Sequence, residues 1–405
     1  MHEMTVVAAG VIFLATYGVM ALGKIPVYRI DRAGAALLGG ALMVGTGVLS
    51  LDEAYRAIGF DTIVLLLGMM IVVANLRLSG FFRVVTNWIA KHVRRPITLL
   101  AMVIFASGFL SAFLVNDTIC LVMTPLVLDL VTRLKRNPIP YLVAIATASN
   151  IGSVATITGN PQNIIIGSLS RIPYGAFAAA LAPIAVIGLM LAAVLIALAY
   201  RSEFLTRDKL EKIEMPTHYH GPLLAKTGLV IAVVVVLFFI GQPVAKVAIV
   251  GGAFLLLTRR VRPEKIYIEI DWPLLVMFVG LFVVIGGVEK VMITPDVVAA
   301  VGRLHLDNTA NLGGLAAVLS NLVSNVPAVL MLKSFIGNLQ DPQRAWLVIA
   351  MAATFAGNFT LVGSVANLIV AQRAKARGVE LGFWAYFKIG APLTVLTIII
   401  GLLWL

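Results

Sequence analysis

The chain has 405 residues, of which 60% are hydrophobic and only 12% are charged. Soluble domains carry about 25% charged residues, and a water-facing surface needs far more polar side chains than this sequence supplies. The composition therefore argues against a soluble enzyme, a disordered chain and a nucleic-acid-binding module. The 31 Lys and Arg exceed the 19 Asp and Glu, as in membrane proteins that concentrate basic residues in cytoplasmic loops. We predict a polytopic membrane protein, and its single Cys leaves no intramolecular disulfide.

Ten apolar runs are long enough, or nearly so, to cross the bilayer as helices. A hydrocarbon layer of ~30 Å needs about 20 residues. The first run has no basic residue before it and is too long for the core of a cleaved signal peptide, so we expect it to be retained. The runs cover residues 4–22, 33–50, 61–76, 139–158, 177–200, 223–241, 244–258, 273–288, 344–362 and 384–405.

Two further apolar regions, 96–134 and 311–340, are interrupted midway by polar residues and by Pro125 or Pro327. Proline removes a backbone donor and breaks a helix, so we predict that each region enters the membrane and returns on the same side as a re-entrant hairpin. Residues 79–95 mix aromatic and basic side chains, which predicts an amphipathic helix in the interface. The predicted fold class is all-α, with about ten transmembrane helices.

The distribution of basic residues predicts the orientation. Lys24, Arg29 and Arg32 follow the first span, which places the N-terminus outside. An even number of crossings then puts both termini on the outer, periplasmic side of a cell inner membrane. All but seven of the 31 Lys and Arg fall inside; the seven outside are Arg56, Arg171, Lys246, Lys290, Arg303, Lys333 and Arg344.

The two halves of the chain resemble each other. Asn116 aligns with Asn325, Asn150 with Asn358, and Asn163 with Asn367. Because each half has five crossings, we expect the second copy to be inverted, as in secondary transporters whose site lies where two repeats with broken helices meet. The predicted units are a first repeat at 1–200 (hairpin about 96–134, broken helix about 139–170), a cytoplasmic connector at 201–222, and a second repeat at 223–405 (hairpin about 311–340, broken helix about 344–372).

Polar residues at membrane depth gather at both hairpin tips and in both broken helices. Gly159-Asn160-Pro161 and Gly363-Ser364 interrupt those helices, and unwound backbone at this depth must line a cavity or be buried in protein. Helix N-termini that begin at such breaks favour an oxyanion or oxyacid. A single Ser, Thr or Asn usually joins helices, but recurrence at both tips and both breaks favours a binding site.

Asp117 is the only acid in the middle of a membrane-depth segment. A carboxyl in a cavity of low dielectric can exchange protons near neutral pH, so Asp117 is the candidate proton-coupling residue; the alternative is a structural cap of the hairpin tip. Its counterpart is Val326, which predicts one titrating group.

None of the four polar clusters contains Arg or Lys. A multivalent carboxylate would need helix dipoles, amides or a bound cation, so the sequence favours a neutral oxyacid such as arsenious acid. His218 and His220 lack further ligands nearby and Cys120 stands alone, so we predict no metal site and no cofactor. We also find no phosphate loop or nucleophilic triad and predict that the chain is not an enzyme.

Three segments resemble the ion transporter superfamily, which includes arsenite-efflux permeases, citrate-type and dicarboxylate carriers and sodium/proton antiporters: NDTICLVMTPLVL (116–128), SNIGSVATITGNPQN (149–163) and SNLVSNVPAVL (320–330). The resemblance implies a scaffold and a transport domain built from inverted repeats. Sodium-coupled dicarboxylate members typically carry Ser-Asn-Thr at both tips, which this chain lacks, so the arsenite-permease or proton-coupled branch is favoured. The site that the resemblance implies comprises Asp117 for protons and, for substrate, Asn116, Thr118, Asn150, Gly159, Asn160, Asn163, Asn325, Asn358, Gly363, Ser364 and Asn367.

The sequence thus predicts a proton-coupled secondary transporter that exports a small inorganic oxyacid, as in arsenite or antimonite efflux, by alternating access. The predicted partners are the oxyacid or anion, protons and the lipid bilayer, with no nucleic acid; the resemblance adds a soluble ATPase subunit, and the oligomeric state stays open. The alternatives are a sodium- or proton-coupled carrier of di- or tricarboxylates or other anions, a sodium/proton antiporter, and a channel.

Overall fold

The computed structural model describes residues 2–22, 24–25, 30–206, 209–211, 213, 218–257 and 261–405. Among these residues, regular structure consists of 21 helices and one antiparallel ladder, in which β1 (Lys24–Ile25) pairs with β2 (Ile30–Asp31). Seven of the described helices are long and apolar enough to cross a membrane. The predicted all-α, polytopic fold class is therefore confirmed.

The same order of ten helices occurs twice along the chain, on either side of α11 (Arg201–Phe204). The first set is α1 (His2–Leu22), α2 (Arg32–Gly45), α3 (Leu51–Ala57), α4 (Phe60–Leu78), α5 (Phe81–His92), α6 (Pro96–Phe113), α7 (Asn116–Arg133), α8 (Pro138–Ser153), α9 (Pro161–Ser170) and α10 (Tyr174–Ala199). The second set is α12 (Gly221–Phe239), α13 (Val244–Leu256), α14 (Pro263–Ile268), α15 (Trp272–Met292), α16 (Pro295–Gly302), α17 (Thr309–Val323), α18 (Asn325–Ile336), α19 (Pro342–Ala356), α20 (Val365–Lys375) and α21 (Phe383–Trp404).

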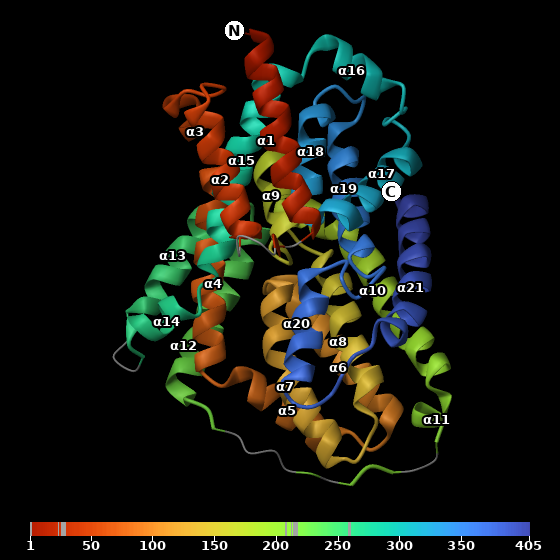
Figure 1. Cartoon of the computed structure of the whole chain (residues 1–405). Helices are drawn as coiled ribbons and strands as arrows, with labels where there is room; N and C mark the ends of the chain where they lie inside the picture. Colours follow the sequence, from red (N-terminus) through yellow and green to blue (C-terminus); the bar gives the residue numbers. More distant parts are fainter. Residues whose placement is uncertain are drawn as a thin grey trace.

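The two sets point in opposite directions. In Figure 1, α6 and α7 lie in the lower half of the view, whereas α17 and α18 lie in the upper half. The helices that restart after the breaks also lie in opposite halves of the view, α9 in the upper half and α20 in the lower half. The start of α1 and the end of α21 both lie in the upper half of the view (Figure 1).

Both predicted hairpins are present, but their breaks do not fall at the prolines. α6 and α7 are separated by Leu114 and Val115, and Pro125 lies inside α7. α17 and α18 are separated by Ser324, whose φ of 78° is unusual for a residue with a side chain. Pro327 lies in the first turn of α18, where the missing backbone donor costs no hydrogen bond. Each break therefore lies directly before an asparagine, Asn116 or Asn325, and not at a proline.

The two predicted broken helices are also present. α8 and α9 are separated by residues 154–160, and α19 and α20 by residues 357–364. Both helices restart at a polar cap. The Asn160 side chain accepts from the backbone of Asn163 at 2.8 Å, and the Ser364 hydroxyl accepts from the backbone of Ala366 at 3.2 Å.

Two predicted spans are shorter than expected. The runs 33–50 and 244–258 form α2 with 14 residues and α13 with 13 residues, about 20 Å at ~1.5 Å per residue and too short for a straight crossing. α2 packs along α15, and α13 packs along α4. Glycines permit both contacts: a Cβ at Gly280 would lie 2.3 Å from the Ala36 backbone, and one at Gly68 would lie 2.5 Å from the Ala248 backbone.

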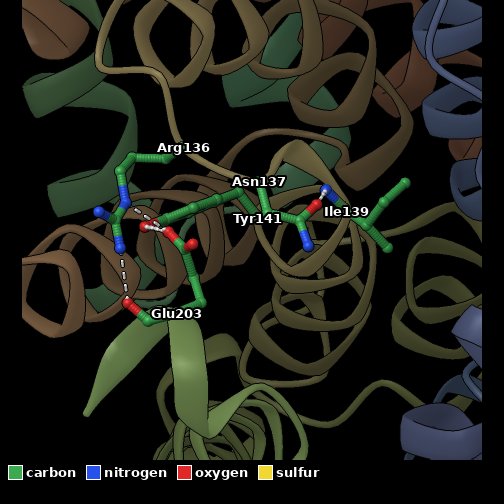
Figure 2. A network of polar contacts seen from close by, with 5 residues as sticks. All are labelled: Arg136, Asn137, Ile139, Tyr141 and Glu203. Atoms are coloured by element: carbon green, nitrogen blue, oxygen red, sulfur yellow. Dashed lines mark hydrogen bonds and ion pairs between the residues drawn. The ribbon is translucent and has the colours of Figure 1, made fainter. Parts of the chain in front are cut away.

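The start of the connector is anchored to the turn between α7 and α8. Figure 2 shows Arg136 donating from Nε to Oε1 of Glu203 at 2.8 Å and from Nη2 to the Glu203 backbone oxygen at 2.9 Å. The Tyr141 hydroxyl donates to the same carboxylate oxygen at 3.2 Å. The side chains of Arg136 and Glu203 are only 16% and 11% exposed, so the pair is largely removed from water.

Candidate functional site

A cavity of about 550 Å³ lies where both hairpin tips and both restarted helices meet. α7 and α9 bring the first tip and the first restart, and α18 and α20 bring their counterparts from the second half. This convergence is the one that the inverted-repeat interpretation requires. The polar lining from these four elements and their first caps is Asn116, Asp117, Gln162, Ser324, Asn325, Ser364 and Gln372.

The first hairpin tip is fixed to the break between α8 and α9. The backbone nitrogen of Asn116 donates to the Gly159 oxygen at 3.0 Å, and the Ser149 hydroxyl donates to the Asn116 oxygen at 3.0 Å. Nδ2 of Asn116 donates to Oδ1 of Asn150 at 2.9 Å. Its own Oδ1 is buried and has no hydrogen-bond partner among the described residues, which is uncommon for a buried polar atom.

Asn150 joins the two halves of the molecule. Its Nδ2 donates to Oδ1 of Asn358 at 2.9 Å and to Oδ1 of Asn367 at 3.1 Å. Its Oδ1 accepts from Asn116 at 2.9 Å and from the Ser364 hydroxyl at 3.3 Å. Asn150 is 1% exposed, and every hydrogen-bonding position of its amide is occupied.

Asn163 and Asn367 hold the unwound segments. Nδ2 of Asn163 donates to the backbone oxygen of Thr156 at 3.0 Å, which lies beyond the end of α8. Nδ2 of Asn367 donates to the oxygens of Gly357 at 2.8 Å and Thr360 at 3.1 Å, beyond the end of α19. Both amides thus satisfy carbonyls that a broken helix leaves without partners.

The second tip has its own polar contacts. The Ser320 hydroxyl lies 2.5 Å from Oδ1 of Asn325 and 2.9 Å from the Ala353 oxygen. Near the first restart, Nε2 of Gln162 donates to Oγ1 of Thr354 at 3.0 Å. Gln162 and Thr354 come from different halves, so this contact adds to the polar contacts between the halves around the cavity.

The predicted site residues divide into two groups. Asn116, Asp117, Asn325 and Ser364 line the cavity, and Thr118 lines an adjoining cavity of about 100 Å³ that Asp117 also lines. The other predicted residues do not line either cavity, are buried, and form the packed support of the lining: Asn150, Gly159, Asn160, Asn163, Asn358, Gly363 and Asn367.

Arg32 lies at the site, although the sequence placed it only in the basic flank after the first span. It lines the 550 Å³ cavity together with Asp31 and Asp271, and its Nε is buried with no partner among the described residues. The four polar clusters contain no Arg or Lys, but the cavity does contain a cation. The packing of α2 against α15 brings Arg32 there, and a linear sequence carries no signal of that contact.

Other candidate groups stay outside the site. Cys120 is fully buried in the apolar core. In the described part of the chain, no three His, Cys, Asp or Glu residues lie close enough to hold a metal ion.

Comparisons with known proteins show which family the chain belongs to. The sequence profile of the citrate transporter family matches residues 17–356. The chain is 30% identical to a protein described as an uncharacterized transporter of Mycobacterium tuberculosis, over 97% of this chain and 96% of that one. It is 27% identical to the silicon efflux transporter LSI3 of Oryza sativa subsp. japonica, over 98% of this chain and 97% of that one.

A solved structure shows the same fold. The YdaH transporter of Alcanivorax borkumensis, whose crystal structure is described as having an unusual topology, superposes with a TM-score of 0.58 at 15% identity, over 99% of this chain and 96% of that chain. The family profile and the sequence relatives confirm the expectation of the ion transporter superfamily. With the family profile covering most of the sequence, the chain belongs to the citrate transporter family of membrane transport proteins.

Proposed function

We propose that the chain exports a small inorganic oxyacid, arsenite or antimonite, by proton-coupled alternating access. The observation that carries this proposal is the lining of the 550 Å³ cavity, where the described residues supply amides, hydroxyls, three carboxylates and one guanidinium. A multivalent carboxylate would face more negative than positive groups there. A neutral polyhydroxy acid needs only donors and acceptors, which the amides and hydroxyls provide.

Asp117 is the proposed proton carrier. It lines both the 550 Å³ cavity and the adjoining 100 Å³ cavity, so a proton taken up at one can be released at the other. The unpartnered Oδ1 of Asn116 beside it can accept a hydrogen bond from a substrate hydroxyl. Substrate and proton would then occupy neighbouring positions on one hairpin tip.

The two hairpins and two broken helices form the proposed transport domain, and the paired helices α2–α15 and α4–α13 belong to the proposed scaffold. We place both termini on the outer side of an inner membrane, with repeats at 1–200 and 223–405. The basic flank after α1 and the connector between the repeats support this orientation.

A relative described as a silicon efflux transporter supports export of an oxyacid, because silicic and arsenious acids are both small, polyhydroxylated and uncharged near neutral pH. Arg32 at the cavity favours a second candidate, a carrier of a singly charged anion or a carboxylate, with which its guanidinium would pair. The family profile, described as that of a citrate transporter, points to the same alternative.

Proteoliposomes separate the two candidates. We expect saturable arsenite counterflow that follows an imposed pH gradient, and no counterflow of labelled citrate or succinate. Carboxylate counterflow that arsenite does not inhibit would overturn the oxyacid proposal in favour of the second candidate. Flux that never saturates and shows no counterflow would identify a channel.

A further inference from the structure

A second cavity, of about 780 Å³, lies outside the substrate cavity and is strongly basic. Four arginines, two histidines and one glutamate line it. Its walls come from the turn between α4 and α5, the middle of α7, residues 218–220 and the end of α20. The His218 and His220 pair, for which the sequence suggested no partner, belongs to this cavity.

The wall that carries the two histidines is fixed to the helical frame. The backbone nitrogen of His220 donates to the Ser79 oxygen at 2.9 Å. Gly80 has a φ of 86°, and a Cβ at this position would lie 2.6 Å from the His218 oxygen. A side chain at Gly80 would therefore displace residues 218–220 from the cavity wall.

The opposite wall is also anchored. Nη1 of Arg377, just beyond α20, donates to the Pro125 oxygen of α7 at 3.1 Å. Arg373 lies one turn earlier, within α20 itself. These two arginines thus lie in or just beyond α20, whereas Arg83 belongs to α5.

Within the described residues, the lining of this cavity neutralises only one of its arginines. Arg77 pairs with Glu269, the one acidic residue among the described residues of the lining. Arg83, Arg373 and Arg377 form no ion pair with any carboxylate of the described residues. Three arginines that line one cavity and have no carboxylate partner among the described residues attract a multivalent anion.

We propose that this cavity binds a phosphate group, with Arg83 on one side and Arg373 and Arg377 on the other. Guanidinium groups present paired donors that match phosphate oxygens. The phosphate comes either from free inorganic phosphate or from the headgroup of an anionic lipid. Because its ligands lie on α5 and in or just beyond α20, a bound phosphate bridges α5 to the proposed transport domain and opposes their relative movement.

The basic cavity adjoins the transport route. Arg77 and Glu269 line both it and the 100 Å³ cavity that Asp117 lines. One ion pair therefore separates the phosphate position from the proposed proton carrier. The effect on transport rests on the proposed function, whereas phosphate binding itself does not.

Thermal unfolding of the purified full chain tests the binding. In lipid-free detergent, inorganic phosphate should raise the midpoint relative to chloride at equal ionic strength. In nanodiscs, phosphatidylglycerol should raise it relative to phosphatidylcholine if the headgroup is the ligand. A rise in the first arm identifies free phosphate, a rise in the second identifies lipid, and a rise in neither overturns the proposal.

Variants assign the effect to the cavity. Arg83→Gln and Arg373→Gln, each at an exposed position, should each weaken the apparent phosphate affinity about ten-fold, with unchanged midpoints in chloride. The control Arg303→Gln removes the same charge from an exposed position that does not line this cavity. An equal loss in the control would mean non-specific charge screening and would refute the site. Because no transport substrate is present, failure of arsenite transport would leave this result intact.

Discussion

The amides of Asn150 and Asn358 meet at 2.9 Å although 208 positions separate them in the chain. The alignment of the two halves of the sequence pairs these asparagines, so this hydrogen bond joins two aligned positions across the molecule. Asn150 also binds Asn367 of the second half and Asn116 of the first. The polar interior of the molecule is therefore organised around one side chain.

Asn150→Ala should destabilise the protein strongly. The substitution leaves several buried partners without hydrogen bonds, which costs about 3 kcal/mol or more. Thermal unfolding in detergent measures the change. Asn75→Ala is the matched control: Asn75 is also fully buried, but its amide makes a single local bond, to the Ile71 oxygen. Equal losses for the two variants would contradict the central role of Asn150.

Asp117→Asn should abolish flux driven by a pH gradient while the protein still inserts and folds, because an amide cannot carry a proton. Asp129→Asn, on the same helix but paired with Arg133 at its exposed end, should transport normally. Proteoliposome flux at several imposed pH gradients measures both variants. Undiminished proton-driven transport by Asp117→Asn would remove this residue from the coupling mechanism.

Glu203→Gln should lower the free energy of unfolding by about 2 kcal/mol. The substitution weakens a largely buried ion pair and leaves Arg136 without its counter-charge. The exposed pair of Lys290 and Glu53, 44% and 41% accessible, gives the comparison: Lys290→Met should cost less than about 1 kcal/mol. A larger effect at Lys290 would show that burial does not set the strength of these pairs.

The Glu53 carboxylate should contribute stability only above acidic pH. Hydrogen bonding to Lys290, and then to the Ser50 backbone, lowers the pKa of Glu53 to about 2 in the folded protein. Since the folded pKa lies below the unfolded value of ~4.3, the contribution is fully present above that value and is lost as pH falls towards 2. Unfolding of the native chain and of Glu53→Gln should therefore differ at pH 6 and converge towards pH 3. A difference that grows in acid would contradict this sign.

Gly280→Val should separate α2 from α15. Its Cβ would fall 2.3 Å from the Ala36 backbone, which cannot move aside as a flexible side chain can. We expect a loss of thermal stability and of transport together, because α2 also holds Arg32 at the cavity. Gly228→Val, a helical glycine with no neighbouring atom within 4 Å, is the control and should be close to neutral.

The sequence was informative where the backbone itself is interrupted. Gly, Pro and Asn at membrane depth mark unwound segments, and their recurrence in both halves predicted the hairpins and broken helices that the structure contains. The positions of the breaks were less accurate, because Pro125 fits within α7 and Pro327 fits in a first turn. Local composition does not reveal where a proline is tolerated.

The sequence could not separate residues that face the cavity from residues that support it. The side-chain amides of Asn163 and Asn367 donate to backbone carbonyl oxygens of the unwound segments. In a sequence, an asparagine with this supporting role cannot be distinguished from one that binds substrate. Arg32 shows the converse limit. It lies at the cavity because two helices far apart in the chain, α2 and α15, pack together. Neither the hydropathy nor the charge pattern of the sequence predicts that contact.

The fully occupied amide of Asn150 restricts how the molecule can move. Separating the two broken helices would break the three hydrogen bonds that join Asn150 to Asn358, Ser364 and Asn367, all of them in the buried interior. A transport cycle that opens the cavity first to one face of the membrane and then to the other must therefore keep this hydrogen-bond network intact. The surfaces that slide past one another must lie around the network and not through it.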